Sequence, residues 1–332
     1  MLNLLPRHQI DPDAWDACVV ASTQRIVYGY SWYLDTVLPK PDWKWMGLVL
    51  IDETGHYRAV MPIPLRRKQV LSLPYEWVVH QPFFCQFLAV FSPDLKLNSD
   101  PFFETMQRSF RYGSMLAISQ RPLGLAFDRV WQQTTHTLDL SVGYDVIYRN
   151  YTHDRQTNLR RAIRANWTII DSDDPEPLLN LFCNYHAETI RGGVAKWAYA
   201  ILRNLIEELN QRGLVLLRYA VRHERIEAGA LFVQSDNRII YLFNAASETG
   251  RRHNARTLLI DQVIQEYAGH SYAGRRYAEK PVVFDFESPE KPSIQGFYRS
   301  FGAVEEPFWA VHWSRLAIAE RLIQHLRNQL SG

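Results

Sequence analysis

Two carboxylates at the end of an apolar segment are the side chains of this sequence best suited to acid–base chemistry. Asp285 lies within the strand-like segment 281–286, and Glu287 follows it. Because side chains alternate between the two faces of a strand, we expect both acids on one side and Phe284 and Phe286 on the other. Either acid could act as a general base for an attacking nucleophile. In the other interpretation, they only end the strand and cap the next helix.

Tyr298 lies shortly after these acids, in a short helix predicted around residues 294–301. Its hydroxyl group could donate a proton to a leaving group. Phe297 and Phe301 flank it, and a tyrosine in such surroundings commonly packs in the core. The sequence is compatible with both interpretations of Tyr298.

A basic loop at residues 250–256 precedes another predicted helix. It contains Arg251, Arg252 and Arg256, with Asn254 between them. Positive charges are unfavourable at the start of a helix, because the helix dipole is positive there. A bound phosphate or carboxylate would relieve this conflict, since helix N-termini bind anions. The loop therefore predicts an anion site, and an exposed polar loop is the alternative.

Aromatic and polar residues gather in two stretches of the first half. The residues that stand out are Trp32, Tyr33, His80 and Gln81. Most of this cluster is expected to pack in the core. Its polar members also indicate a groove, and we predict that these four residues bind a substrate.

Composition is typical of a globular protein with one large domain or two of ordinary size. The 332 residues are 47% hydrophobic and 22% charged, which argues against disorder. The formal charge of only +2 argues against a dedicated nucleic-acid-binding protein. No apolar run is long enough to span a bilayer, and the N-terminus lacks the features of a signal peptide. We therefore expect a cytoplasmic protein.

The cysteines do not indicate a metal centre. Cys18, Cys85 and Cys183 are far apart in the sequence and match no metal-ligand spacing. We interpret them as buried thiols in a reducing compartment. We predict no metal site and no tightly bound cofactor.

Hydrophobic periodicity divides the second half into strands and helices in the order β-α-α-β-β-β-α-β-α-β, a mixed α/β architecture. Strands between residues 214 and 245 are predicted to form an antiparallel meander, and the last helix is predicted at Ser314–Leu330. The first half repeats the plan more loosely, with Gln86–Phe91 as its third strand. We predict two domains, at residues 1–150 and 151–332.

Five short patches have a further similarity. Thr137–Leu140 precedes a basic helix with Asn158–Arg164, Leu258 and Leu259 open the helix after the meander, and Phe284–Ser288 is followed by Phe297–Ala303. With the order of elements, these patches resemble the GNAT superfamily of acyltransferases. The doubled plan resembles its Fem-type peptidoglycan aminoacyltransferases and their uncharacterised relatives. The resemblance implies an α/β fold with mixed sheets, in two tandem GNAT-like acyl-CoA N-acyltransferase domains.

The resemblance also implies a reaction, the transfer of an acyl or aminoacyl group to the amine of a small molecule or peptide. We expect acyl-CoA as the donor rather than aminoacyl-tRNA, because the net charge is small and no long coiled-coil insertion is visible. In this fold the central strand separates from its neighbour, which implies that Phe243, Asn244 and Ala245 hold the acyl carbonyl.

Two further residues gain a role only from the resemblance. His186 and Glu188 lie in a predicted helix near the entry of acceptors in this fold. The resemblance implies that they contact the acceptor. The alternative is a solvated helical face.

One motif departs from the superfamily pattern. The donor loop normally reads Arg/Gln-x-x-Gly-x-Gly/Ala, and its backbone amides hold the coenzyme A pyrophosphate. If Arg251 opens the motif, Asn254 replaces the first glycine and Arg256 the last small residue. This departure implies an unusual donor, or a non-catalytic GNAT-fold binding protein that has lost donor binding.

Overall fold

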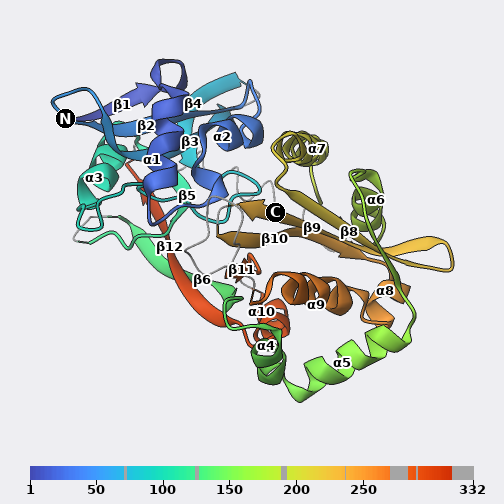
Figure 1. Ribbon diagram of the computed structural model, residues 1–332. Helices are drawn as coiled ribbons and strands as arrows, with labels where there is room; N and C mark the ends of the chain where they lie inside the picture. The colour runs from blue at the N-terminus through green and yellow to red at the C-terminus, as the bar shows by residue number, and fades with distance from the viewer. Residues whose placement is uncertain are drawn as a thin grey trace. The chain divides into compact units, whose positions relative to one another are not determined.

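The structure is a computed structural model that describes residues 1–70, 73–123, 127–187, 193–235, 237–269, 283–288 and 291–315 (Figure 1). It divides into two compact units. The first contains residues 1–133 and the chain from Phe308 onward, and the second contains Thr134–Pro307. The boundary predicted after residue 150 marks a repeat in the sequence, and it stays a prediction.

The first unit contains both helices and strands. Its elements are β1 (Leu2–Pro6), α1 (Pro12–Ala21), α2 (Ser31–Val37), β2 (Trp43–Ile51), β3 (Tyr57–Val70), β4 (Leu73–His80), α3 (Asp100–Ser109) and β5 (Tyr112–Ile118). Two long strands, β6 (Arg129–Asp139) and β12 (Val304–Ser314), run through both units.

The second unit carries most of the described helices. Its elements are α4 (Tyr144–Asn150), α5 (His153–Arg164), β7 (Thr168–Asp171), α6 (Glu176–Tyr185), α7 (Lys196–Gln211), β8 (Val215–Arg222), β9 (Arg225–Ser235), β10 (Arg238–Ala246), α8 (Glu248–Arg252), α9 (Ala255–Tyr267), β11 (Val283–Asp285) and α10 (Pro292–Arg299).

Both units have the same strand order and strand directions. The order is β1-β2-β3-β4-β5-β12 in the first unit and β7-β8-β9-β10-β11-β6 in the second. In each, the first four strands pair antiparallel, the fourth and fifth pair parallel, and the fifth and sixth pair antiparallel. The sixth strand of each unit comes from the other half of the sequence. This repetition agrees with the predicted doubled α/β plan.

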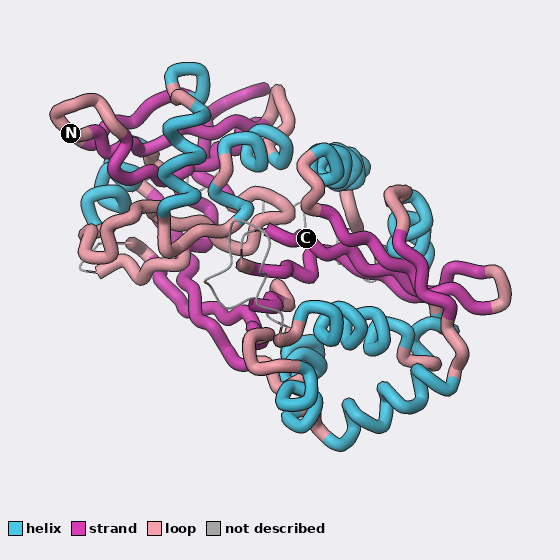
Figure 2. Tube along the Cα trace, viewed as in Figure 1, coloured by secondary structure: helices cyan, strands magenta, loops and turns pink. Residues whose placement is uncertain are grey.

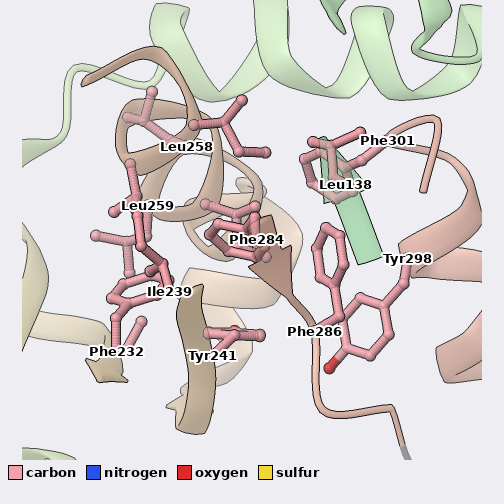
Figure 3. Packing of buried hydrophobic residues seen from close by; sticks show 14 of the residues in the cluster. Leu138, Phe232, Ile239, Tyr241, Leu258, Leu259, Phe284, Phe286, Tyr298 and Phe301 are labelled. Atoms are coloured by element: carbon pink, nitrogen blue, oxygen red, sulfur yellow. The ribbon is translucent and has the colours of Figure 1, made fainter. Parts of the chain in front are cut away.

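Helices cover both faces of the sheet in the second unit, with α6 and α7 on one face and α9 on the other (Figures 1 and 2). α9 buries nine of its thirteen residues, because the sheet packs on one side of it and α5 on another. Its apolar side chains meet those of β9, β10 and β11 in one core, where Leu259, Ile239 and Phe284 lie close together (Figure 3). This core fixes the start of α9 relative to the end of β10.

The element order predicted for the second half is confirmed. In the first half, the strand predicted at Gln86–Phe91 is wrong, because that segment makes only isolated bridges through Leu88 and Phe91. The strand that follows the β2–β3 hairpin is β4, which pairs with β3. The prediction of a buried Cys183 is also wrong, because this thiol is exposed. Apart from its first two residues, the predicted helix Ser314–Leu330 lies outside the described residues.

Candidate functional site

The two parallel strands β10 and β11 separate after a short paired stretch. They pair over three residues each, from Arg238 opposite Val283 to Ile240 opposite Asp285. β10 then continues to Ala246 beside β9, with a bulge between Tyr241 and Phe243. The chain after β11 stays with β6 instead, because the Phe286 N–H donates to the His136 carbonyl at 2.9 Å. The two strands therefore form a fork.

The β10 arm of the fork carries the strand-end residues predicted from the sequence. Ala245 is buried, whereas Phe243 and Asn244 are half-buried. The Phe243 ring packs against Phe182 of α6 at 4.9 Å between centroids. The side-chain oxygen of Asn244 accepts a hydrogen bond from Arg256 Nη1 at 2.9 Å. This arm is thus linked to the first turn of α9.

A pocket of about 220 Å³ opens beside this turn. Its lining comes from α5, the α8–α9 junction and α10, and consists of Arg155, Asn158, Gly250, Arg251, Asn254, Arg256, Thr257 and Phe297. Three of these side chains are arginines and none is acidic. Such a lining favours a ligand with negative charge.

The local geometry of the pocket wall depends on Gly250. Ser247 caps α8 by accepting the Gly250 N–H at 3.0 Å, and its own N–H donates to the Glu227 carbonyl at 2.9 Å. A Cβ atom at Gly250 would lie 2.2 Å from that carbonyl oxygen. Only glycine therefore allows α8 to approach β9 this closely.

Asn254 has the backbone conformation for which a glycine is normally used. Its φ is 57° and its ψ is 32°, in the left-handed region, where it precedes α9 as the N-cap. Asparagine adopts this region more readily than other residues with a Cβ atom. The replacement of the first motif glycine by Asn254 therefore preserves the turn that opens α9.

Arg155 is a member of the pocket that the sequence did not assign to it. Its side chain is buried, with Nε donating to Ser300 Oγ at 2.9 Å and Nη1 to Thr257 Oγ1 at 2.5 Å. Burial and the nearby charge of Arg256 lower the pKa of Arg155 to about 10, so it stays protonated at neutral pH. The other arginines of this basic helix have the same spacing of three and four residues, so the sequence carried no signal that singled out Arg155.

Other predicted residues lie around this pocket without lining it. Arg252 is exposed. His186 Nε2 lies 3.2 Å from both the N–H and the carbonyl of Ala246, at the end of β10. Burial lowers the pKa of this histidine. Glu188 lies outside the described residues.

Asp285 occupies the branch point of the fork and is fully buried. Its Oδ2 atom accepts from Arg238 Nη1 at 2.6 Å, and its Oδ1 atom accepts from Thr135 Oγ1 at 2.7 Å. The Glu287 N–H also donates to Oδ1, at 2.9 Å. The carboxylate therefore ties β6, β10 and β11 together.

Glu287 does not share a strand face with Asp285, so that expectation is wrong. β11 ends at Asp285, and Glu287 has a φ of 45°. Its side chain is half-buried. The charge of Glu287 contributes to the raised pKa of Tyr298, so the two side chains lie near each other.

Tyr298 lies between the base candidate and the pocket. Its ring stacks on Phe286 with centroids 4.6 Å apart (Figure 3), and it is 4% exposed. Burial raises its pKa to about 12, while Arg256 lowers the pKa and Glu287 raises it. The phenol is therefore protonated at neutral pH, with a pocket cation and a carboxylate as its charged neighbours.

The four candidates of the first unit have different environments. Tyr33 is buried and donates to the Phe84 carbonyl, and Gln81 Nε2 donates to the Cys85 carbonyl at 2.6 Å. Both therefore hold the loop after β4. Trp32 is half-buried. His80 contacts Arg66 at 3.4 Å, and burial together with this cation lowers its pKa to about 4.

Two further features bear on the chemistry. Within the described ranges, no group of His, Cys, Asp and Glu side chains is arranged to hold a metal ion. The helices in the described part of the chain are too short or too polar to cross a bilayer.

Comparisons with known proteins agree with this geometry. Residues 147–277 match the family model of the acetyltransferase (GNAT) domain. The fold is similar to that of FemX, with a TM-score of 0.61 and 12% identity over 99% of this chain and 100% of that chain. It is also similar to L-PGS from Bacillus licheniformis, with a TM-score of 0.50 and 13% identity over 96% of each chain.

A conserved protein of unknown function from Bacteroides thetaiotaomicron has a TM-score of 0.50 and 8% identity, over 94% of this chain and 100% of that chain. No curated protein matches the sequence. At these identities the solved structures establish the fold alone. The family model adds a similarity of residues 147–277 to the GNAT domain, and the fold of the chain resembles that of FemX.

Proposed function

We propose that this chain, with its GNAT acyltransferase domain at residues 147–277, transfers an acyl group from acyl-CoA to the amine of a small molecule or peptide. One observation carries the proposal. A pocket lined by three arginines and no acid lies at the start of α9, and a hydrogen bond from Arg256 to Asn244 links it to the β10 arm of the fork.

The pocket suits the pyrophosphate of the donor. Arg155, Arg251 and Arg256 supply positive charge, and charge-assisted hydrogen bonds from arginine to phosphate are among the strong ones. Asn254, Arg256 and Thr257 at the start of α9 line the same space, where the helix dipole also favours an anion. Donor binding therefore relies on side-chain charge in addition to backbone amides.

The fork suits the thioester. Beyond Ile240, β10 is no longer paired with β11, and we propose that this end of the strand, Phe243–Ala245, holds the acyl carbonyl. A backbone N–H there would stabilise the negative charge that develops on the carbonyl oxygen during attack.

Two side chains transfer the protons of the proposed reaction. The amine nitrogen attacks the thioester carbon, a C–N bond forms and the C–S bond breaks. Glu287 takes the proton that the amine loses, and Tyr298 gives its proton to the leaving thiolate. Glu287 suits the base role better than Asp285, because it is half-exposed whereas Asp285 is buried and ion-paired.

The acceptor is a separate question from the donor. In the first unit, we propose that Trp32 and His80 contact a substrate, while Tyr33 and Gln81 shape the loop beside them through their hydrogen bonds to Phe84 and Cys85. His186, held at the end of β10 by its contacts to Ala246, is proposed to contact the acceptor in the second unit. Acyl-CoA is a cytoplasmic metabolite, so we propose the cytoplasm as the site of the reaction.

Calorimetric titration with acetyl-CoA tests the donor assignment. We expect binding, and we expect R251M to weaken it about tenfold or more, the value of a hydrogen bond to a charged group. R252M is the matched control, because Arg252 is adjacent and exposed but does not line the pocket. Absence of heat from the wild-type protein would exclude acetyl-CoA as donor, and equal losses in both variants would exclude the pocket.

The two alternatives give different results. If the donor is an aminoacyl-tRNA, a charged tRNA binds and acetyl-CoA does not. If the chain is a non-catalytic binding protein that has lost donor binding, neither acetyl-CoA nor a charged tRNA binds and no acetyl group reaches any amine. Release of free thiol from acetyl-CoA in the presence of glycinamide, compared with its absence, separates this last case from an enzyme.

A further inference from the structure

The three residues after the fork are all fixed through their backbone N–H groups. The acceptors lie in β6 and at the end of β11, and the bonds are Phe286 N–H to His136 O at 2.9 Å, Glu287 N–H to Asp285 Oδ1 at 2.9 Å, and Ser288 N–H to Thr135 Oγ1 at 3.3 Å. A loop that is held at each residue presents its side chains in one arrangement.

Glu287 has an unfavourable backbone conformation within this loop. Its φ of 45° lies in the left-handed region, which residues with a Cβ atom adopt only when neighbouring interactions stabilise it. The N–H of Glu287 donates to Asp285 Oδ1 in this conformation. The carboxylate of Asp285 therefore stabilises the backbone that sets the direction of the Glu287 side chain.

Asp285 is poorly placed to take a proton from a substrate. Its side chain is fully buried and ion-paired with Arg238 at 2.6 Å. An ionised carboxylate has about four lone-pair positions, and Arg238, Thr135 and the Glu287 N–H use three of them.

From these contacts we propose that Asp285 is a positioning residue that holds Glu287 in its catalytic orientation. The inference rests on the proposed function, which makes Glu287 the base. Thr135 belongs to the same arrangement, because its hydroxyl donates to Asp285 Oδ1 and accepts the Ser288 N–H. Loss of either group frees the loop that carries Glu287 while the donor pocket stays intact.

A double-mutant cycle between Asp285 and Glu287 tests the coupling. With acetyl-CoA and glycinamide as substrates, we expect E287Q to lower kcat about 10²-fold or more, the contribution of a general base. D285N should lower kcat about 10- to 100-fold, because displacement of a reacting group by about 1 Å has an effect of this size. In the E287Q background, D285N should then change kcat by less than about twofold. The KM for acetyl-CoA should be unchanged throughout.

Two controls separate positioning from general destabilisation. D261N alters another buried carboxylate of the same unit, which accepts hydrogen bonds from Tyr144 and Tyr151, and it should leave kcat unchanged. T135V should reproduce the kcat loss of D285N in a milder form, and T135S, which keeps the hydroxyl, should restore it. If D285N does not fold, the pair T135V and T135S still decides.

Hydrogen exchange gives a readout that does not need turnover. The Glu287 amide should exchange several-fold faster in D285N than in the wild type, because its acceptor is weakened, and it should be unaffected in D261N. The positioning role is overturned if the Glu287 amide is as well protected in D285N as in the wild type. It is also overturned if the kcat losses of D285N and E287Q multiply in the double variant. If E287Q keeps full activity while the amide still loses protection in D285N, the assignment of the base is wrong instead.

Discussion

Arg238 and Asp285 form a buried ion pair at the point where β10 and β11 separate. Nη1 of Arg238 lies 2.6 Å from Oδ2 of Asp285, and the two side chains are 17% and 0% exposed. Arg238 starts β10, Asp285 ends β11, and the last pairing between the strands is Ile240 with Asp285. Beyond this pair, β10 stays paired with β9 and the chain after β11 stays with β6. The ion pair therefore closes the paired part of the fork.

We expect R238M to destabilise the protein by about 3–5 kcal/mol, because it leaves the buried charge of Asp285 without its partner. R299M is the matched control. Arg299 also pairs with a carboxylate, Glu305, but both side chains are about half exposed, and exposed pairs contribute only about 0–1 kcal/mol. Urea unfolding of both variants measures the difference. Equal losses would show that burial of the pair does not matter.

Gly250 should not tolerate a side chain. G250A places a Cβ atom 2.2 Å from the Glu227 carbonyl oxygen, so α8 must move away from β9, at a cost of about 1–3 kcal/mol. Acetyl-CoA binding should weaken as well, because Gly250 lines the pocket. G296A is the control, since a Cβ atom there meets nothing within 4 Å and alanine favours a helix over glycine by about 0.5–1 kcal/mol. Thermal unfolding should move in opposite directions for the two variants.

The sequence predicted the element order of the second half because each element there has a clear apolar period. α7 is an example, with Ile201, Leu205 and Leu209 all buried. It failed for Gln86–Phe91, whose apolar residues pack as an irregular segment between strands. Hydrophobic periodicity alone does not distinguish such a segment from a strand. The sequence also did not predict that β6 and β12 each pair in the unit formed mainly by the other half of the chain. Pairing between strands that are distant in sequence leaves no local pattern.

The sequence predicted the basic segment of the candidate site but not the buried side chains around it. Arg251, Asn254 and Arg256 were found because the sequence places arginines just before a predicted helix, and all three line the pocket. The expected loop was wrong for Arg251, which lies in the last turn of α8. Arg155 was missed, because a buried arginine in a basic helix has the same sequence signature as its exposed neighbours. The burial of Asp285 was missed for a related reason, since its partners Thr135 and Arg238 are distant in sequence.

His80 should make stability depend on pH in the acid range. Its folded-state pKa is lowered to about 4 by burial and by Arg66, so the unfolded chain binds a proton that the folded protein does not. The stability contribution is complete above the unfolded pKa near 6.5 and is lost as pH falls toward 4, by at most about 1.4 kcal/mol per pH unit. H80Q removes this dependence.

Unfolding free energies at pH 7.5 and pH 4.5 provide the measurement. Carboxylates titrate in both proteins, so the informative quantity is the difference between the wild type and H80Q. The wild type should lose more stability on acidification than the variant. If the unfolding free energies of the wild type and H80Q differ by the same amount at both pH values, His80 titrates normally in the folded protein.

Asn254 should be replaceable by glycine but not by alanine. Its φ of 57° is open to glycine without steric cost, whereas a residue with a Cβ atom pays about 1–2 kcal/mol there. Asparagine escapes part of this cost because its short polar side chain suits the left-handed region. We therefore expect N254G to keep both the thermal stability and the acetyl-CoA affinity of the wild type, and N254A to lose stability by about 1 kcal/mol.

If N254A behaves like N254G, the backbone at this position relaxes, and the turn does not depend on left-handed propensity. If N254G instead loses affinity about tenfold while keeping stability, the Asn254 side chain itself contacts the donor, in the manner of a hydrogen bond to a charged group.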